Sequence, residues 1–417
     1  MCVCRRVARD LSDQSPLTLP QLALYCYDDE PVRDLPPALV DRLETLRLSW
    51  GKSTMAGPYE ICSGSLRQLS LGVDGPWYPR HPLTLRCPRL TELTLPQPST
   101  CHGEEPRLIL HCPSLRTAHG LGYFTHVEFG CPSPLVERLT SPGRRCLQQH
   151  GSLWPGLTRL DGVGADSDQV GLLIGAQSAL TSLREVRRLS ISAVPEGLNV
   201  ALDLLPSLRV LGFDVSDGSA MVSLEDENTS PNLVSLTLRS PHLAHLSAEL
   251  AMTGAFSLAC PALTHLDIQC AEQYPKGDEL PCPAFRWLVK PMDLKTLVLG
   301  SDIAPSTRRS LLRDGACASL RGLDVGRLVD PGNFLETLPE FPRLRVLMAK
   351  LVTRQPVVMQ SASLVTLVLS GIARSVSLGC PWLEDIWVPS DATMPIQWAG
   401  APSEWMVSPL TGFVCRW

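Results

Sequence analysis

The chain has no long apolar run. None of its segments reaches the roughly 18 consecutive apolar residues of a membrane-spanning helix, so we expect no membrane span. Residues 1–14 contain no apolar core of the kind that a secretory signal requires, which predicts an intracellular, cytoplasmic protein. The net charge of −5 is small and provides no basic surface for nucleic acid. The composition therefore argues against membrane and nucleic-acid partners.

The chain also lacks the short motifs that carry common enzyme chemistry. It contains no Gly-x-x-x-x-Gly-Lys phosphate loop, no Gly-x-Gly-x-x-Gly, no Gly-x-Ser-x-Gly and no His-Glu-x-x-His. Its 15 cysteines are odd in number and scattered, which is unlike a framework of small disulfide loops and predicts reduced thiols. We therefore expect neither an enzyme nor a bound cofactor.

What the chain does contain is a recurring phrase, Leu-x-x-Leu-x-Leu. Close copies begin at Leu43, Leu66, Leu90, Val186, Leu208, Leu233, Leu263, Leu294, Leu320, Leu344, Leu364 and Leu383. Looser copies begin at Leu115, Leu157, Leu243 and Phe285. Adjacent copies are mostly about 19 to 26 residues apart, which is the period of a solenoid of leucine-rich turns.

Each copy predicts one short strand. The last two apolar residues are two positions apart, so their side chains point to one face, and the first leucine reaches the same interior from the preceding turn. A single copy buries too little apolar surface to be stable alone. Neighbouring copies are therefore expected to stack and to join their strands into one parallel sheet.

A Cys-Pro pair introduces many of the copies. The cysteines are Cys87, Cys112, Cys131, Cys260, Cys282 and Cys380. Proline fixes φ and ends the preceding element, so the chain turns into the strand at this point. The same position holds Ser240, Leu205 or Phe341 in other copies, so we interpret the cysteine as a compact buried hydrophobe rather than a metal ligand.

The form Cys-Pro-x-Leu-x-x-Leu-x-Leu, as in residues 87–95 and 260–268, resembles the leucine-rich repeat superfamily. It is similar to the irregular cysteine-containing repeats often found behind F-boxes, and the resemblance covers roughly residues 40–390. The asparagine that usually follows the strand is missing, since the chain has only four Asn and none lies on the expected rhythm. The first copy begins eight residues after Leu35, which leaves no room for an F-box.

We therefore predict an α/β fold leaning to β, a leucine-rich repeat solenoid with a parallel concave sheet and a mixed convex side. Alternating apolar residues favour convex strands within residues 81–88, 106–113, 255–261 and 375–381. Helix signals favour short convex helices within residues 194–205, 304–315 and 330–338.

Three regions are predicted along the chain. Residues 1–40 form an N-terminal flank and cap, and residues 41–390 form the solenoid, irregular at 96–156 and with an insertion at 164–182. Residues 391–417 form a C-terminal Trp-rich cap, because five of the nine tryptophans lie in the final 36 residues. An aromatic patch that binds a partner is the alternative interpretation of these tryptophans.

One cluster of histidine and cysteine is a candidate zinc site. It comprises Cys101, His102, His111, Cys112, His119, His126 and Cys131. Structural zinc takes four such ligands, but the spacing is not that of a zinc finger and no Cys-x-x-Cys pair occurs. Ordinary irregularity of the repeat is the favoured interpretation, and no metal is predicted.

The residue between the last two leucines of each copy faces away from the core. This predicts an outward row of Arg47, Ser70, Thr94, Ser190, Gly212, Thr237, Asp267, Val298, Asp324, Met348, Val368 and Trp387. Its last part is largely apolar, and exposed apolar patches with an aromatic anchor often mark binding sites. The candidate binding residues are Val298, Asp324, Met348, Val368 and Trp387.

The expected function is that of a protein-interaction module or scaffold. A monomer would bind an unidentified protein partner on the concave face of the solenoid. The alternative is a substrate receptor of a ubiquitin ligase that lacks a recognisable F-box.

Overall fold

The structure is a computed structural model of the 417-residue chain. It describes residues 21–26, 40–50, 53–55, 59–73, 77–79, 82–96, 107–131, 135–142, 144–151, 154–163, 180–192, 198–202, 205–216, 235–250, 255–270, 284–300, 303, 308, 311–312, 318–328, 338, 341–389, 395–398, 405–407 and 413–416. The chain divides into two compact units. Unit 1 comprises residues 1–190 and 204–208, and unit 2 comprises residues 191–203 and 209–417.

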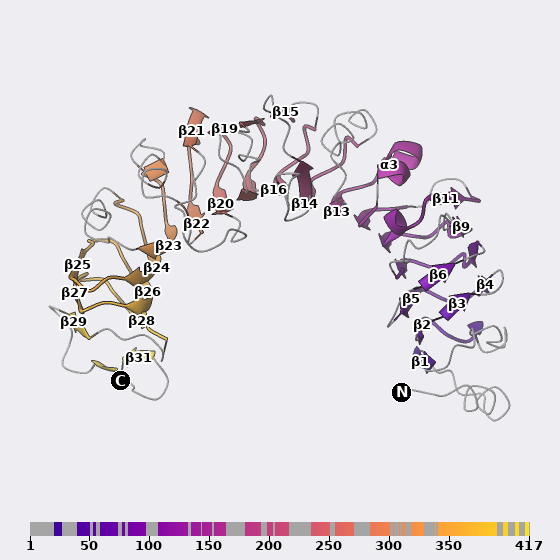
Figure 1. Cartoon of the computed structure of the whole chain (residues 1–417), viewed down its shortest axis with the longest axis horizontal. Helices are drawn as coiled ribbons and strands as arrows, with labels where there is room; N and C mark the ends of the chain where they lie inside the picture. Colours follow the sequence, from indigo (N-terminus) through magenta and orange to yellow (C-terminus); the bar gives the residue numbers. More distant parts are fainter. Residues whose placement is uncertain are drawn as a thin grey trace, which may run out of the picture. The chain divides into compact units, whose positions relative to one another are not determined.

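Unit 1 is a solenoid of stacked parallel strands (Figure 1). Its front sheet pairs, in this order, β1 (Gln21–Cys26), β2 (Thr45–Trp50), β5 (Gln68–Val73), β8 (Glu92–Thr94), β10 (Thr117–His119), β12 (Arg138–Thr140), β13 (Arg159–Val163) and β14 (Glu185–Ser192). Its back sheet pairs β4 (Tyr59–Cys62), β7 (Leu83–Arg86), β9 (Arg107–Leu110) and β11 (His126–Phe129), also in parallel. The pair β3 (Ser53–Met55) and β6 (Trp77–Pro79), the 3₁₀ helix η1 (Leu121–Tyr123) and the helix α3 (Arg144–His150) complete it.

Unit 2 repeats the same architecture. Its front sheet pairs β16 (Val210–Ser216), β18 (His245–Leu250), β20 (His265–Cys270), β22 (Thr296–Leu299), β23 (Gly322–Leu328), β24 (Val346–Val352), β26 (Thr366–Ile372) and β28 (Asp385–Trp387) in parallel. Two antiparallel strands, β31 (Phe413–Arg416) and β30 (Trp405–Val407), extend it beyond β28. The back sheets are β15 (Leu198–Ala201), β17 (Leu236–Arg239), β19 (Ala255–Ala259) and β21 (Ala284–Val289), and then β25 (Pro356–Gln360), β27 (Ser375–Gly379) and β29 (Ile396–Trp398).

The leucines of the phrase form the core between front and back strands. In the first copy Leu43, Leu46 and Leu48 are each at most 1% exposed, as the alternation requires. A fully buried leucine contributes about 1.5–3 kcal/mol, so three of them in every turn supply most of the driving force for stacking. The core is thus built from the repeated leucines, as the sequence predicts.

The Cys-Pro turn has a defined hydrogen-bond pattern. The backbone N–H of Leu90 donates to the carbonyl of Cys87 at 3.0 Å, which closes a tight turn at the entrance to the strand. The buried Cys87 thiol donates to the Ile61 carbonyl of the previous turn at 3.6 Å, and Cys112 donates to Leu85 at 3.7 Å. Ser63 takes the same position earlier in the chain and donates to the Val40 carbonyl at 3.1 Å.

These thiols are chemically quiet. Burial raises the pKa of Cys87 to about 12 and that of Cys112 to about 11, so both stay protonated at neutral pH and keep their hydrogen available to a carbonyl. The thiols of Cys87 and Cys112 thus bond carbonyls of the back strands β4 and β7 of the preceding turns. This agrees with the interpretation of the turn cysteine as a compact buried side chain.

The back of the solenoid is mostly strand. The four predicted back strands are present as β7, β9, β19 and β27. The predicted helix at residues 194–205 is wrong, because that segment holds β15, which pairs with β17. The described residues therefore support the solenoid but not the predicted mixture of strands and helices on the back.

Several other predicted segments are covered only in part by the described residues. Within residues 304–315 the described positions Arg308, Leu311 and Leu312 are helical, and within 330–338 only Leu338 is described. Residues 164–179, most of the predicted insertion, lie outside the described residues. In the ranges described above, neither α3 nor any other helix has the length and apolar character needed to cross a bilayer.

Candidate functional site

The front sheet of unit 2 places the five predicted binding residues in one line. The strand register sets Val298 opposite Asp324, Asp324 opposite Met348, Met348 opposite Val368, and Val368 opposite Trp387. The strands involved, β22 to β28, lie side by side at the orange and yellow end of the chain (Figure 1). Since strands in a sheet are about 4.8 Å apart, the five positions form one continuous row.

The apolar members of this row face outward. Met348 is 40% and Trp387 47% exposed, and Val346, two residues before Met348 on the same face, is 37% exposed. The residues that alternate with them, such as Leu347 and Leu367, are fully buried and pack into the core. We call Val298, Val346, Met348, Val368 and Trp387 the apolar strip.

Asp324 interrupts the strip and has a structural task of its own. Its Oδ1 accepts a hydrogen bond from the backbone N–H of Gly326 at 2.9 Å. Gly326 has a φ of +56°, and the register between β23 and β24 shifts at this point, so the carboxylate stabilises a bulge. Desolvation raises the pKa of Asp324, and the Gly326 hydrogen bond opposes this only partly.

The C-terminal strands meet the strip at its edge. Strand β31 pairs antiparallel with β28 and sets Phe413 opposite Trp387, so its backbone continues the sheet beyond the last parallel strand. This pairing satisfies the edge of β28 while Trp387 keeps nearly half of its surface exposed. Pairing with β28 thus covers an open sheet edge and leaves the face that carries the strip accessible.

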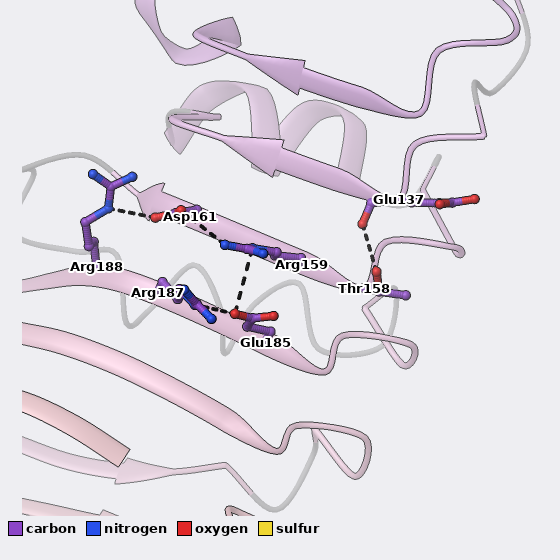
Figure 2. A network of polar contacts seen from close by, with 7 residues as sticks. All are labelled: Glu137, Thr158, Arg159, Asp161, Glu185, Arg187 and Arg188. Atoms are coloured by element: carbon purple, nitrogen blue, oxygen red, sulfur yellow. Dashed lines mark hydrogen bonds and ion pairs between the residues drawn. The ribbon is translucent and has the colours of Figure 1, made fainter. Parts of the chain in front are cut away.

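The front sheet of unit 1 carries paired charges instead of an apolar strip (Figure 2). Arg188 Nε donates to Asp161 Oδ1 at 2.7 Å, and Arg187 pairs with Glu185. Arg159 lies between the two acids, with a nitrogen 3.8 Å from each of them. Because the charges are matched and partly solvated, each pair contributes at most about 1 kcal/mol, and the face is a neutralised polar surface.

Part of the predicted outward row is wrong. Thr237 lies on the back strand β17, because the phrase at Leu233 pairs with β15 and β19, and the looser copy at Leu243 supplies the front strand β18 with Ser247. On β14 the residue opposite Asp161 of β13 is Arg187, and the side chain of Ser190 lies outside the described part of the structure. Strand β12 was missed altogether, since its segment has Val136 and Leu139 at the expected spacing but Ser141 in place of the last leucine.

The histidine and cysteine cluster does not converge on a metal site among its described members. Cys112 donates its thiol to the Leu85 carbonyl, and His119 makes an edge contact with the ring of Tyr123. Cys101 and His102 lie outside the described residues. Over the part of the chain that the structure describes, no three His, Cys, Asp or Glu side chains group as metal ligands.

Two histidines stack on the front sheet of unit 2. His245 and His265 are opposite each other on β18 and β20, with ring centroids 4.1 Å apart and planes 8° from parallel. His265 Nδ1 also contacts the Thr264 hydroxyl at 2.8 Å. Desolvation lowers the pKa of His265, and the charges of His245 and Lys295 lower it further.

This pair is expected to make unit 2 sensitive to acid. Because the pKa of His265 is lower in the folded than in the unfolded chain, the unfolded chain binds the extra proton as the pH falls below about 6.5. Stability is therefore complete above that pH and decreases below it. The His265→Gln variant is expected to weaken this decrease in urea unfolding measured between pH 7.5 and 5. The exposed His242→Gln variant is the control, and an equal acid response in all three proteins would contradict the expectation.

No protein-family model matches this chain, and the search of curated proteins found no relative that matches it.

Proposed function

We propose that this protein is a binding module of the leucine-rich repeat kind, a scaffold that holds a protein partner on the front sheet of unit 2. The leucine-rich phrase and the stacked parallel strands support the repeat assignment. The same proposal includes a back side of strands with short helices in some turns. It also includes a role in binding rather than catalysis.

The observation that carries the proposal is the exposed apolar strip. Met348 and Trp387 stand in one register row and keep 40% and 47% of their surface exposed. Soluble proteins rarely keep a contiguous apolar patch with an aromatic anchor exposed, and binding energy at interfaces is concentrated in such anchors. A partner that buries Trp387 and Met348 would gain apolar contact without any rearrangement of the sheet.

Substituting the strip is expected to abolish capture of the partner. Met348→Asp and Trp387→Asp each place a charge where the partner would bury apolar surface, so recovery should fall about tenfold or more. The measurement is quantitative affinity capture with cross-linking, and circular dichroism verifies that each variant is folded.

Matched controls lie elsewhere in the same unit. Val358 is 57% exposed on the back strand β25, and Trp382 is 69% exposed in the turn before β28. Val358→Asp and Trp382→Asp are expected to retain capture. If the strip variants and these controls recover the same proteins in the same amounts, the binding face lies elsewhere and the proposal fails.

A further inference from the structure

Positive charges bracket the apolar strip on strand β24. Val346 and Met348 face outward, Arg345 immediately precedes them at the entrance to the strand, and Lys350 follows on the same face. Burial alternates along the strand, so Met348 and Lys350 point to the same side while Leu347 and Ala349 point into the core. The apolar centre of this strand is therefore flanked at both ends by exposed cations.

The neighbouring turn carries cations at both ends of its strand as well, although Asp324 stands between them. The backbone N–H of Arg345 donates to the carbonyl of Arg321 at 2.8 Å, so the two arginines stand on adjacent turns at the same edge of the strip. At the other edge Arg327 of β23 is opposite Lys350. All four side chains are exposed. Within the described ranges, no ion pair engages Arg321 or Arg345.

Few carboxylates offset these cations. Asp324 is half-buried and accepts the Gly326 N–H, and Asp293 lies 3.2 Å from Lys295 in an ion pair. Glu384 and Asp385 are exposed, but they stand at the Trp387 end of the strip, two strands away from β24. Asp267 on β20 stands opposite Val298, two strands away from β23. Among the described residues, β23 and β24 with their entrance positions therefore carry four cations and a single carboxylate, that of Asp324, although the chain as a whole is negative.

We propose that the partner presents an acidic peptide segment, with large apolar side chains over Met348 and Trp387 and carboxylates beside Arg321 and Arg345. This rests on the proposed binding role of the strip. The apolar contact would supply most of the affinity, and the carboxylates would set the position of the segment by pairing with guanidinium groups. Unpaired cations beside an apolar row favour such a partner over a neutral or basic one, because like charges next to one another are unfavourable.

The test is selection of random 12-residue peptides displayed on phage against the full-length protein. The expected result is enrichment of peptides that combine Asp or Glu with Leu, Phe or Trp. Synthetic copies of the best peptides, and copies with every acid changed to lysine, are then measured by fluorescence polarisation at about 50 and 500 mM salt. The acidic copies should bind more tightly and weaken with salt, and the lysine copies should not bind.

Charge reversal locates the contact. The Arg321→Glu/Arg345→Glu variant is expected to weaken the acidic peptides about tenfold or more and to gain binding of the lysine copies. The control is Arg286→Glu/Arg354→Glu, which reverses two exposed cations of unit 2 outside the strip, and it should leave binding unchanged. Met348→Asp should abolish binding of every selected peptide.

Each other outcome overturns the inference in a distinguishable way. Selected peptides that are neutral or basic, but are lost with Met348→Asp, would overturn the acidic partner and leave the binding role of the strip standing. Acidic peptides whose binding is unchanged by Met348→Asp would bind elsewhere. That result would contradict both the acidic partner segment and the binding role of the strip. Failure of the selection to enrich any peptide would overturn the acidic segment, and the capture experiment would then decide the binding role alone.

Discussion

Replacing Trp154 by alanine is expected to lower the free energy of unfolding by about 3–5 kcal/mol. Trp154 is fully buried and makes edge contact with Phe129 at 5.6 Å between ring centroids, with His150 also close at 6.2 Å. It takes the turn position that Cys87 takes in an earlier copy, since the Leu157 N–H donates to its carbonyl at 3.0 Å. In this turn α3 follows the front strand β12 in the place where other turns have a back strand. The buried indole of Trp154 packs beside His150 of α3.

The size of the loss depends on the cavity that alanine would leave. The cluster is tied to its surroundings, because His150 Nε2 contacts the Val127 carbonyl at 2.7 Å and thereby links α3 to β11. Such a tied cluster cannot collapse easily around a missing side chain. In a solenoid each turn depends on its neighbours, so the loss is expected to destabilise unit 1 beyond this one turn.

Two variants serve as controls for the urea unfolding measurement. Trp154→Phe keeps an aromatic ring and removes the indole N–H, which has no hydrogen-bond partner among the described residues, so less than half of the loss is expected. Trp387→Ala removes a half-exposed ring and should cost about 1 kcal/mol or less. A loss below about 1 kcal/mol for Trp154→Ala would show that the aromatic cluster does not hold this turn together.

Alanine at Gly371 is expected to destabilise unit 2 by at least about 2 kcal/mol, through strain in the backbone. Gly371 has a φ of +91° on β26, and a Cβ added there would lie 2.1 Å from the Leu351 carbonyl oxygen. That oxygen belongs to the strand opposite in the register, so it cannot move without breaking the pairing of β24 with β26. The chain must therefore distort at this position.

Gly322 provides the opposite case in the same sheet. Its backbone does not have a positive φ, and an added Cβ would make only ordinary contacts, the nearest being Thr296 Cγ2 at 3.8 Å. Gly322→Ala is expected to stabilise the protein by about 0.4–1 kcal/mol, because alanine restricts the unfolded chain. The measurement is the urea midpoint of unfolding, which should fall for Gly371→Ala and rise for Gly322→Ala. Equal shifts for the two variants would contradict the assigned backbone conformations.

The core was predictable residue by residue because the spacing of leucines has a direct physical meaning. Leu294, Leu297 and Leu299 alternate as the phrase requires, and all three are buried. The alignment of Met348, Val368 and Trp387 also followed, since equal positions in successive copies become neighbours once the copies stack. The row of Met348, Val368 and Trp387 could therefore be predicted from the sequence, whereas the exposure of Val346 beside it could not.

Other features could not be inferred in this way. Arg345 and Lys350 do not stand at a position that the repeat specifies. Only the pairing of β23 with β24 shows that four cations lie beside the apolar strip. The thiol donors were likewise missed, because a Cys-Pro turn specifies where the chain bends but not which carbonyl of the previous turn lies within reach of the sulfur.

The sequence by itself determined the period, the buried leucines and the turns, because these depend on spacing within a few neighbouring residues. The tertiary structure decided which strand belongs to the front sheet and which to the back. The segments at Leu233 and Leu243 have the same alternation, yet one forms β17 at the back and the other β18 at the front. A strand with one buried face has the same alternation of apolar residues whether it lies in the front or the back sheet. Only its pairing with the strands of adjacent turns therefore assigns it to one sheet.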